Sequence, residues 1–130
     1  MLNDLDRSLQ QFNDAVDEFS KKIPDRLVEL QQKIGLEALR RIVYKTPVDT
    51  GRARGNWQVT IDKPAVGVLV PAIADPVGQG GLMLADLPPF TTVWITNNVP
   101  YIKYLEDGSS KQAPQGMVSV TLGELKAMFE

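Results

Sequence analysis

Four charged side chains are the best candidates for chemistry in this chain: Asp49, Glu106, Arg52 and Arg54. The two carboxylates could serve as the acid and base of a hydrolase, although Asp49 lies in a Pro-Val-Asp-Thr-Gly stretch typical of an Asx-type turn. The chain has no histidine and no cysteine, so the commonest general base and metal ligand is missing and thiol chemistry is excluded. We therefore expect no catalytic residue, no cofactor and no metal site, and rank a carboxylate hydrolase last.

Arg52 and Arg54 flank a single residue, so in an extended chain both guanidinium groups point the same way. Such a pair suits carboxylates of a neighbouring subunit or of the same chain, with Glu106 as a candidate, or phosphates. The alternative is a solvated pair. Tyr101 and Tyr104 lie three residues apart on an expected short helix and share a face, so that one packs into the core and the other keeps its hydroxyl near water.

Charge is unevenly distributed along the chain. Residues 39–54 hold five cations and one carboxylate, whereas residues 1–32 hold seven carboxylates and four cations. An acidic arm and a basic corner could attract each other between neighbouring copies. The alternative is a solvated helix face together with cations that the C-terminus of a helix favours.

The N-terminal segment carries a heptad pattern, which predicts a long amphipathic helix with one narrow apolar stripe. The stripe is expected to pack either on the rest of the domain or on another copy. Pro24 either kinks this helix or opens a second one, which ends near Tyr44 because Pro47 follows. We assign residues 1–23 to a helical arm and residues 24–130 to one domain. The stripe consists of Leu2, Leu5, Leu9, Phe12, Val16, Phe19 and Ile23.

Two alternating runs, residues 57–62 and 66–70, predict a β-hairpin, and residues 91–96 predict a central strand. Trp57 and Trp94 are expected in the core of the sheet. Asn98 can cap the short helix that carries the tyrosines, and helical spacing from Val118 to Phe129 predicts a C-terminal helix. The fold class is therefore α+β, with a small, mainly antiparallel sheet flanked by helices.

Residues 71–90 hold four prolines and three glycines, which predicts a long Pro/Gly-rich loop. Its apolar residues favour a mobile segment that docks on a partner after assembly. A loop packed on its own domain is the alternative. Leu82, Leu84 and Phe90 are the interface candidates here. No run of 18 apolar residues and no secretory signal occurs, so we expect a protein made in a cytoplasm, with no membrane partner.

Two segments of this chain resemble a family of small virion proteins from long-tailed bacteriophages, the neck or tail-completion proteins. The first reads Thr-Pro-Val-Asp-Thr-Gly-Arg-x-Arg-x-x-Trp and ends at Trp57, and the second runs from Asn98 through Tyr101, Tyr104 and Glu106 to Gly108. The resemblance covers roughly residues 25–129. The family usually has a serine or threonine soon after the basic pair, where this chain has Gly55-Asn56.

The resemblance implies a structural protein of the virion, not an enzyme, which completes the tail or joins it to the head. It implies a sixfold or twelvefold ring of copies between portal-side connector proteins and tail-tube or tail-terminator proteins, with viral DNA passing through. The expected interface residues are those of the stripe, Asp49, Arg52, Arg54, Leu82, Leu84, Phe90, Tyr101, Tyr104 and Glu106. A tail terminator is the runner-up. A nucleic-acid-binding adaptor, using Arg40, Arg41, Lys45, Arg52 and Arg54, is the alternative from another class.

Overall fold

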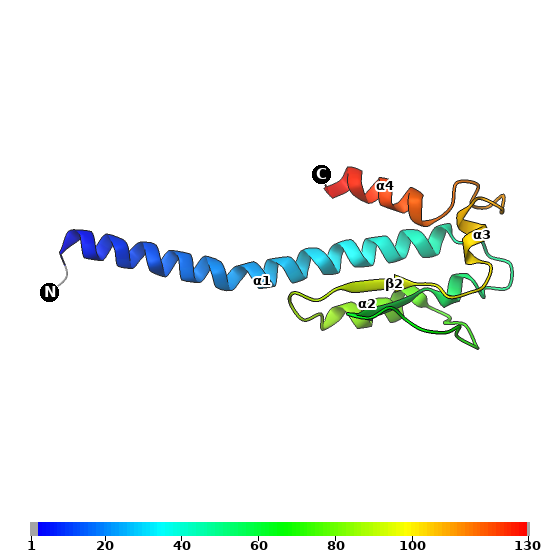
Figure 1. Ribbon diagram of the computed structural model, residues 1–130, viewed down its shortest axis with the longest axis horizontal. Helices are drawn as coiled ribbons and strands as arrows, with labels where there is room; N and C mark the ends of the chain where they lie inside the picture. Colours follow the sequence, from blue (N-terminus) through cyan, green and yellow to red (C-terminus); the bar gives the residue numbers. More distant parts are fainter. Residues whose placement is uncertain (1–2, 130) are drawn as a thin grey trace.

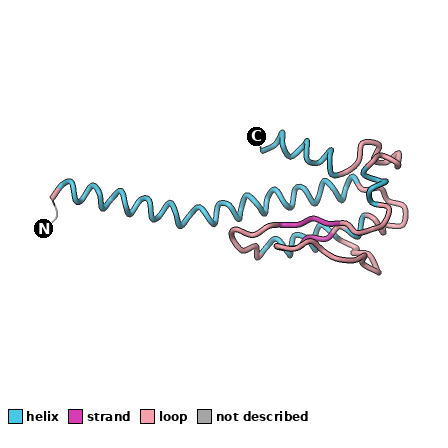
Figure 2. The backbone as a smooth tube through the Cα atoms, in the orientation of Figure 1, coloured by secondary structure: helices cyan, strands magenta, loops and turns pink. Residues whose placement is uncertain are grey.

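A computed structural model describes residues 3–129. They fold into several helices and one small two-stranded antiparallel sheet (Figures 1 and 2). A long helix runs through the molecule; the sheet and a short helix lie on one side of it, and the C-terminal helix lies on the other. In chain order the elements are α1 (Asp4–Lys45), the 3-10 turn η1 (Arg54–Asn56), β1 (Gln58–Ile61), α2 (Pro76–Ala85), β2 (Val93–Thr96), α3 (Ile102–Glu106) and α4 (Val118–Phe129).

Helix α1 is continuous for 42 residues, so of the two expectations for Pro24 the single long helix is correct. The Asn3 side chain caps its first turn by accepting a hydrogen bond of 2.8 Å from the Asp6 amide. The helix ends where Thr46 becomes extended ahead of Pro47. Its N-terminal half projects beyond every other element, and its C-terminal half forms one wall of the domain core (Figure 1).

The sheet consists of β1 and β2, paired antiparallel from Gln58↔Thr96 to Ile61↔Val93. The predicted hairpin between residues 57–62 and 66–70 is therefore wrong, because the partner of the first strand is β2. Side-chain amides hold residues 65–69 as a loop: Asn56, Gln58 and Asn98 all bond to the backbone of that segment. Val66 and Val70 are consequently exposed.

Helix α2 lies within the segment that was expected to be a long mobile loop, so that expectation is also wrong. Asp75 caps the helix by accepting a 3.0 Å hydrogen bond from the Gly78 amide, and Pro76 occupies its first turn. The glycines allow close packing. A Cβ atom on Gly80 would overlap the side chains of Leu39 and Val59, and one on Gly35 would lie 3.3 Å from Leu84. Helix α2 is thus packed tightly across α1 and β1.

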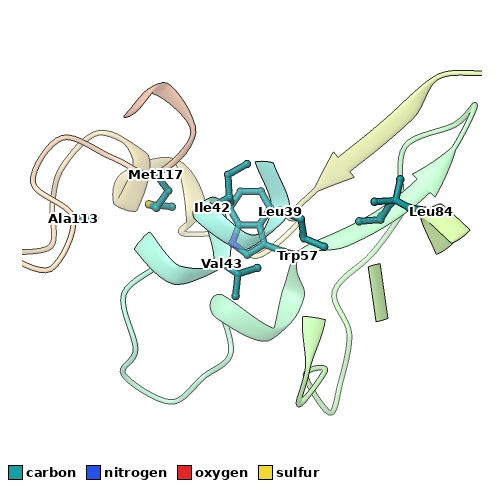
Figure 3. Close-up of a cluster of buried hydrophobic side chains, with 8 residues drawn as sticks. Leu39, Ile42, Val43, Trp57, Leu84, Ala113 and Met117 are labelled. Carbon is teal, nitrogen blue, oxygen red and sulfur yellow. The ribbon is translucent and has the colours of Figure 1, made fainter. Parts of the chain in front are cut away.

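The core joins α1, β1, α2 and the segment before α4. In Figure 3 the Trp57 ring lies among Leu39, Ile42 and Val43 of α1, and Met117 closes one end. Trp94 is 40% exposed, which contradicts its expected burial. Alternate side chains of a strand face opposite sides, and in β2 it is Val93 and Ile95 that pack on the core.

The C-terminal helix is confirmed as α4, and α3 is the expected short helix. Asn98 does not cap α3, because its side-chain amide donates to the carbonyls of Ala65 and Gly67. Tyr101 stands at the N-cap position of α3 without a side-chain capping bond. Within residues 3–129, none of the helices combines the length and the apolar character needed to cross a membrane.

Candidate interaction surface

The first of the two sequence segments forms a network of hydrogen bonds at the C-terminal end of α1, which we call the Thr46 network. Thr46 is fully buried; its hydroxyl donates to the carbonyl of Ile42 (2.6 Å) and accepts from Nε1 of Trp57 (2.8 Å). Arg54 donates to the carbonyls of Tyr44 (3.0 Å) and Thr46 (2.9 and 3.2 Å). These carbonyls have no partner within the helix, so a cation there both satisfies them and suits the helix dipole. Within this chain Arg54 is a helix cap.

Asn56 belongs to the same Thr46 network, and the sequence had not identified it as a structural residue. Its side chain is fully buried, donates to the carbonyls of Arg52 (2.7 Å) and Leu69 (3.4 Å), and accepts from the Leu69 amide (2.7 Å). Next to it, a Cβ atom on Gly55 would lie 2.5 Å from the carbonyl oxygen of Ile73. Gly55 thus allows the backbone at Ile73 to come close, and the Asn56 side chain connects the loop at Leu69 to Arg52. A buried asparagine between two turn regions is the signal that could have found it.

Glu106 does not pair with either arginine in this chain. Its carboxylate accepts hydrogen bonds from the amides of Met117 (2.9 Å), Val118 (2.8 Å) and Ser119 (3.0 Å) at the start of α4. Partial burial alone would raise the pKa of Glu106, but the amides of Val118, Ser119 and Met117 and the Ser119 hydroxyl together lower that pKa below its usual value. The expected intramolecular salt bridge is therefore wrong, and Glu106 caps α4.

Arg52 is the exposed member of the arginine pair. Its guanidinium carbon lies 5.8 Å from the centroid of the Tyr101 ring, a cation–π distance that links the two sequence segments. Asp49 is exposed on the loop beside it, where Gly51 has a φ of +81° and the Thr50 hydroxyl accepts a hydrogen bond of 3.3 Å from the Arg52 amide. Tyr104 is 70% exposed, as predicted for one member of the pair, whereas Tyr101 is only half-buried and is not among the residues that pack on the core.

The basic corner is partly neutralised by a carboxylate that the sequence reasoning did not single out. Glu124 of α4 pairs with Arg41 (2.5 Å) and with Lys45, and Glu37 pairs with Arg40 (3.4 Å) and more distantly with Arg41. A hydrogen bond from Lys45 is the main reason that the pKa of Glu124 is lowered; burial opposes it, and the charges of Lys45 and Arg41 add to it. This network ties α4 to α1 beside a cavity of about 750 Å³, which Arg54 and Tyr44 also line.

The apolar stripe of the arm is uncovered. Leu5 is 67% exposed, Phe12 66% and Phe19 60%, and Leu9 and Val16 are also exposed; Leu2 lies outside the described residues. Exposed apolar patches of this length mark interaction sites in stable proteins. The other candidates divide: Leu82 and Phe90 are exposed, whereas Leu84 is 3% exposed and belongs to the core, which contradicts its prediction as an interface residue.

An apolar groove continues the stripe at the base of the arm. Its floor is α1, at Leu27, Leu30 and Ile34, and its walls are α4 on one side and the start of β2 on the other. The groove has a volume of about 620 Å³. Leu122 and Phe90, on its two walls, are 61% and 77% exposed. The stripe and the groove together form one long apolar surface along α1.

The two carboxylates that were candidates for chemistry lie on different elements of the chain. Asp49 lies on the loop after α1, whereas Glu106 is occupied by the amides at the start of α4. Among residues 3–129 there is no group of three or more carboxylates that could hold a metal ion. No model of a known protein family matches this chain, and neither a curated protein nor a solved structure matches it.

Proposed function

We propose that this chain is a structural virion protein of a long-tailed bacteriophage, which forms part of the neck and completes or joins the tail to the head. The observation that carries the proposal is the helical arm, which projects from the domain with an exposed apolar stripe. A structural joint needs exposed apolar surfaces that can bind neighbouring subunits, and such a stripe is one. The resemblance of the two sequence segments to the neck family supplies the identity of the assembly.

Contacts between the two resembling segments support the same proposal. They lie about fifty residues apart in the sequence, and two contacts join them: Asn97, beside the second, donates to the carbonyl of Ala53 in the first (2.8 Å), and Arg52 stacks on Tyr101. Arg54 and Glu106 fix helix ends, and Asn56 and Asn98 fix loops. Segments of this kind build a rigid platform, and the exposed side chains on it, Asp49, Arg52 and Tyr104, are free to face a neighbouring subunit.

The nucleic-acid adaptor has weaker support. Of its five cations, Arg54 is used by helix carbonyls, and Arg41 and Lys45 are paired with Glu124. Phosphate binding depends on cations whose charge is available to the ligand. Arg40 and Arg52 remain the most accessible of the five, and two cations make a small footprint for a nucleic acid.

Disruption of the gene in the phage that encodes it tests the proposed function. We expect filled heads and separate or defective tails in electron micrographs, and recovery of joined virions when the wild-type gene is supplied in trans. A gene lacking the codons for residues 2–20 should give a folded domain that does not restore joining. Intact, infectious particles from the disrupted phage would overturn the proposal and bring the nucleic-acid adaptor to the front.

A further inference from the structure

The stripe on α1 has a symmetric spacing that bears on what covers it. From Leu5 to Val16 its intervals are four, three and four residues, and from Ile34 back to Ile23 they are again four, three and four. All of these residues lie on one continuous helix. Two copies of α1 laid antiparallel therefore bring the apolar residues of one arm opposite those at the base of the other arm, as Leu5–Ile34, Leu9–Leu30, Phe12–Leu27 and Val16–Ile23, with the two-fold axis between Phe19 and Ser20.

We propose that the free protein forms a two-fold pair, in which the arm of each copy lies in the apolar groove of the other. The groove cannot be filled by the arm of its own chain, because the arm and the floor of the groove are parts of the same helix. A second copy supplies a stripe of matching spacing. The contact is the same for both copies, so it closes after two.

Charge on the flanks of the stripe agrees with this register. The arm positions nearest the stripe are mostly small or neutral, at Ser8, Asn13, Ala15 and Ser20. The antiparallel register also brings Asp4, near one edge of the stripe, towards Lys33 of the second copy. Opposite charges at the edge of a helix pair favour the register, and like charges would oppose it.

The area of the stripe decides between this pair and a coiled coil of arms alone. At 1.5 Å per residue the stripe from Leu5 to Ile34 is about 44 Å long, and a helix about 10 Å wide then buries roughly 900 Å² over two copies. The arms alone, from Leu5 to Ile23, would bury only roughly 540 Å². Specific interfaces exceed about 1,000 Å². The arms alone fall well short of this size, whereas the pair that includes the groove approaches it, and Phe90 and Leu122 on the walls of the groove add to the contact.

Light scattering on the full chain at tens of micromolar tests the proposal. We expect twice the chain mass of 14.4 kDa, and the chain mass alone for the variant Phe12→Asp. The control Gln11→Asp places the same new charge one residue away, off the stripe, and should keep the pair. Circular dichroism should show equal helix content in all three proteins. A wild-type monomer would overturn the pair and leave the stripe to a different protein.

Cysteine cross-linking tests the register, and the natural absence of cysteine makes single-site variants unambiguous. Ser20 lies at the expected two-fold axis, so Ser20→Cys should form a disulfide between two copies upon mild oxidation. Leu9→Cys should not, because Leu9 faces Leu30 of the second copy. Self-cross-linking of Leu9→Cys would instead indicate parallel arms and overturn the antiparallel register. The pair does not rest on the proposed function, because it concerns the free chain and virion counts do not enter its test.

Discussion

The Thr46 network, which includes Asn56 and Trp57, and the helical arm around Phe12 differ in whether their side chains have partners. In the Thr46 network both buried polar side chains have partners: Asn56 makes three hydrogen bonds, and Thr46 makes two. In the arm the apolar side chains have no cover, and most of the hydrogen bonds are those of the helix itself. The difference teaches that the stability of this chain is concentrated at one end of α1 and its capacity to associate at the other.

The largest expected effect comes from a pair of identical substitutions in the two regions. Asn56→Ala removes the side-chain partner of the Leu69 amide and of two partly buried carbonyls, which should lower the free energy of unfolding by roughly 3 kcal/mol. Asn13→Ala in the exposed arm should change it by less than about 0.5 kcal/mol. Urea denaturation at sub-micromolar chain concentration measures both. Equal effects of the two substitutions would contradict the view that the Thr46 network stabilises the fold and the arm does not.

A pair of glycine substitutions sharpens the contrast within the domain itself. Gly80→Ala forces a methyl group against Leu39 and Val59 and should destabilise by about 1–3 kcal/mol. Gly123→Ala, in α4, meets no atom within 4 Å. It should stabilise by up to about 1 kcal/mol, because alanine favours a helix over glycine. Thermal unfolding of the two variants should therefore shift in opposite directions. A shift in the same direction would mean that α2 does not pack as closely as described.

The smallest expected effect concerns the pH dependence of the α4 cap. The pKa of Glu106 is lower in the folded chain than its ordinary value of 4.5, so its charge stabilises the fold above that value. This stabilisation is lost as the pH falls through the lower folded pKa. The stability gap between wild type and Glu106→Gln should therefore be constant above about pH 5.5 and shrink below pH 4.5. Glu18→Gln, on the exposed arm, is the control, and a gap that widened in acid would contradict the capping role.

The sequence predicted the elements whose signal is local. The heptad pattern of the arm up to Ile23, the β-branched run of β2 and the spacing in α4 each identified an element by its own residues. The hairpin with residues 66–70 failed because distant amides, above all Asn56 and Asn98, hold that segment as a loop. Helix α2 was missed because its three glycines and the prolines around it are typical of a loop, although Asp75-Pro76 is a helix start.

For the candidate site, the sequence located the residues better than their roles. The stripe of the arm is exposed, as an interface requires. Arg54 and Glu106, however, were expected to pair, and each caps a different helix. A helix end leaves backbone groups that compete for any nearby charge. Which charge reaches which end depends on how the helices cross, and the sequence does not state that.

The continuity of α1 has a consequence for the thermodynamics of docking. An arm that is already helical, and is anchored in the core at Leu39, Ile42 and Val43, loses little conformational entropy when a partner arrives. Most of the free energy from covering Leu5, Phe12 and Phe19 then remains available for affinity, because preorganisation removes the cost of ordering. A flexible arm of the same composition would bind more weakly. Pro24 has no backbone N–H group and so removes one hydrogen bond from α1. The helix nevertheless continues through Pro24, so the arm is preorganised before it contacts a partner.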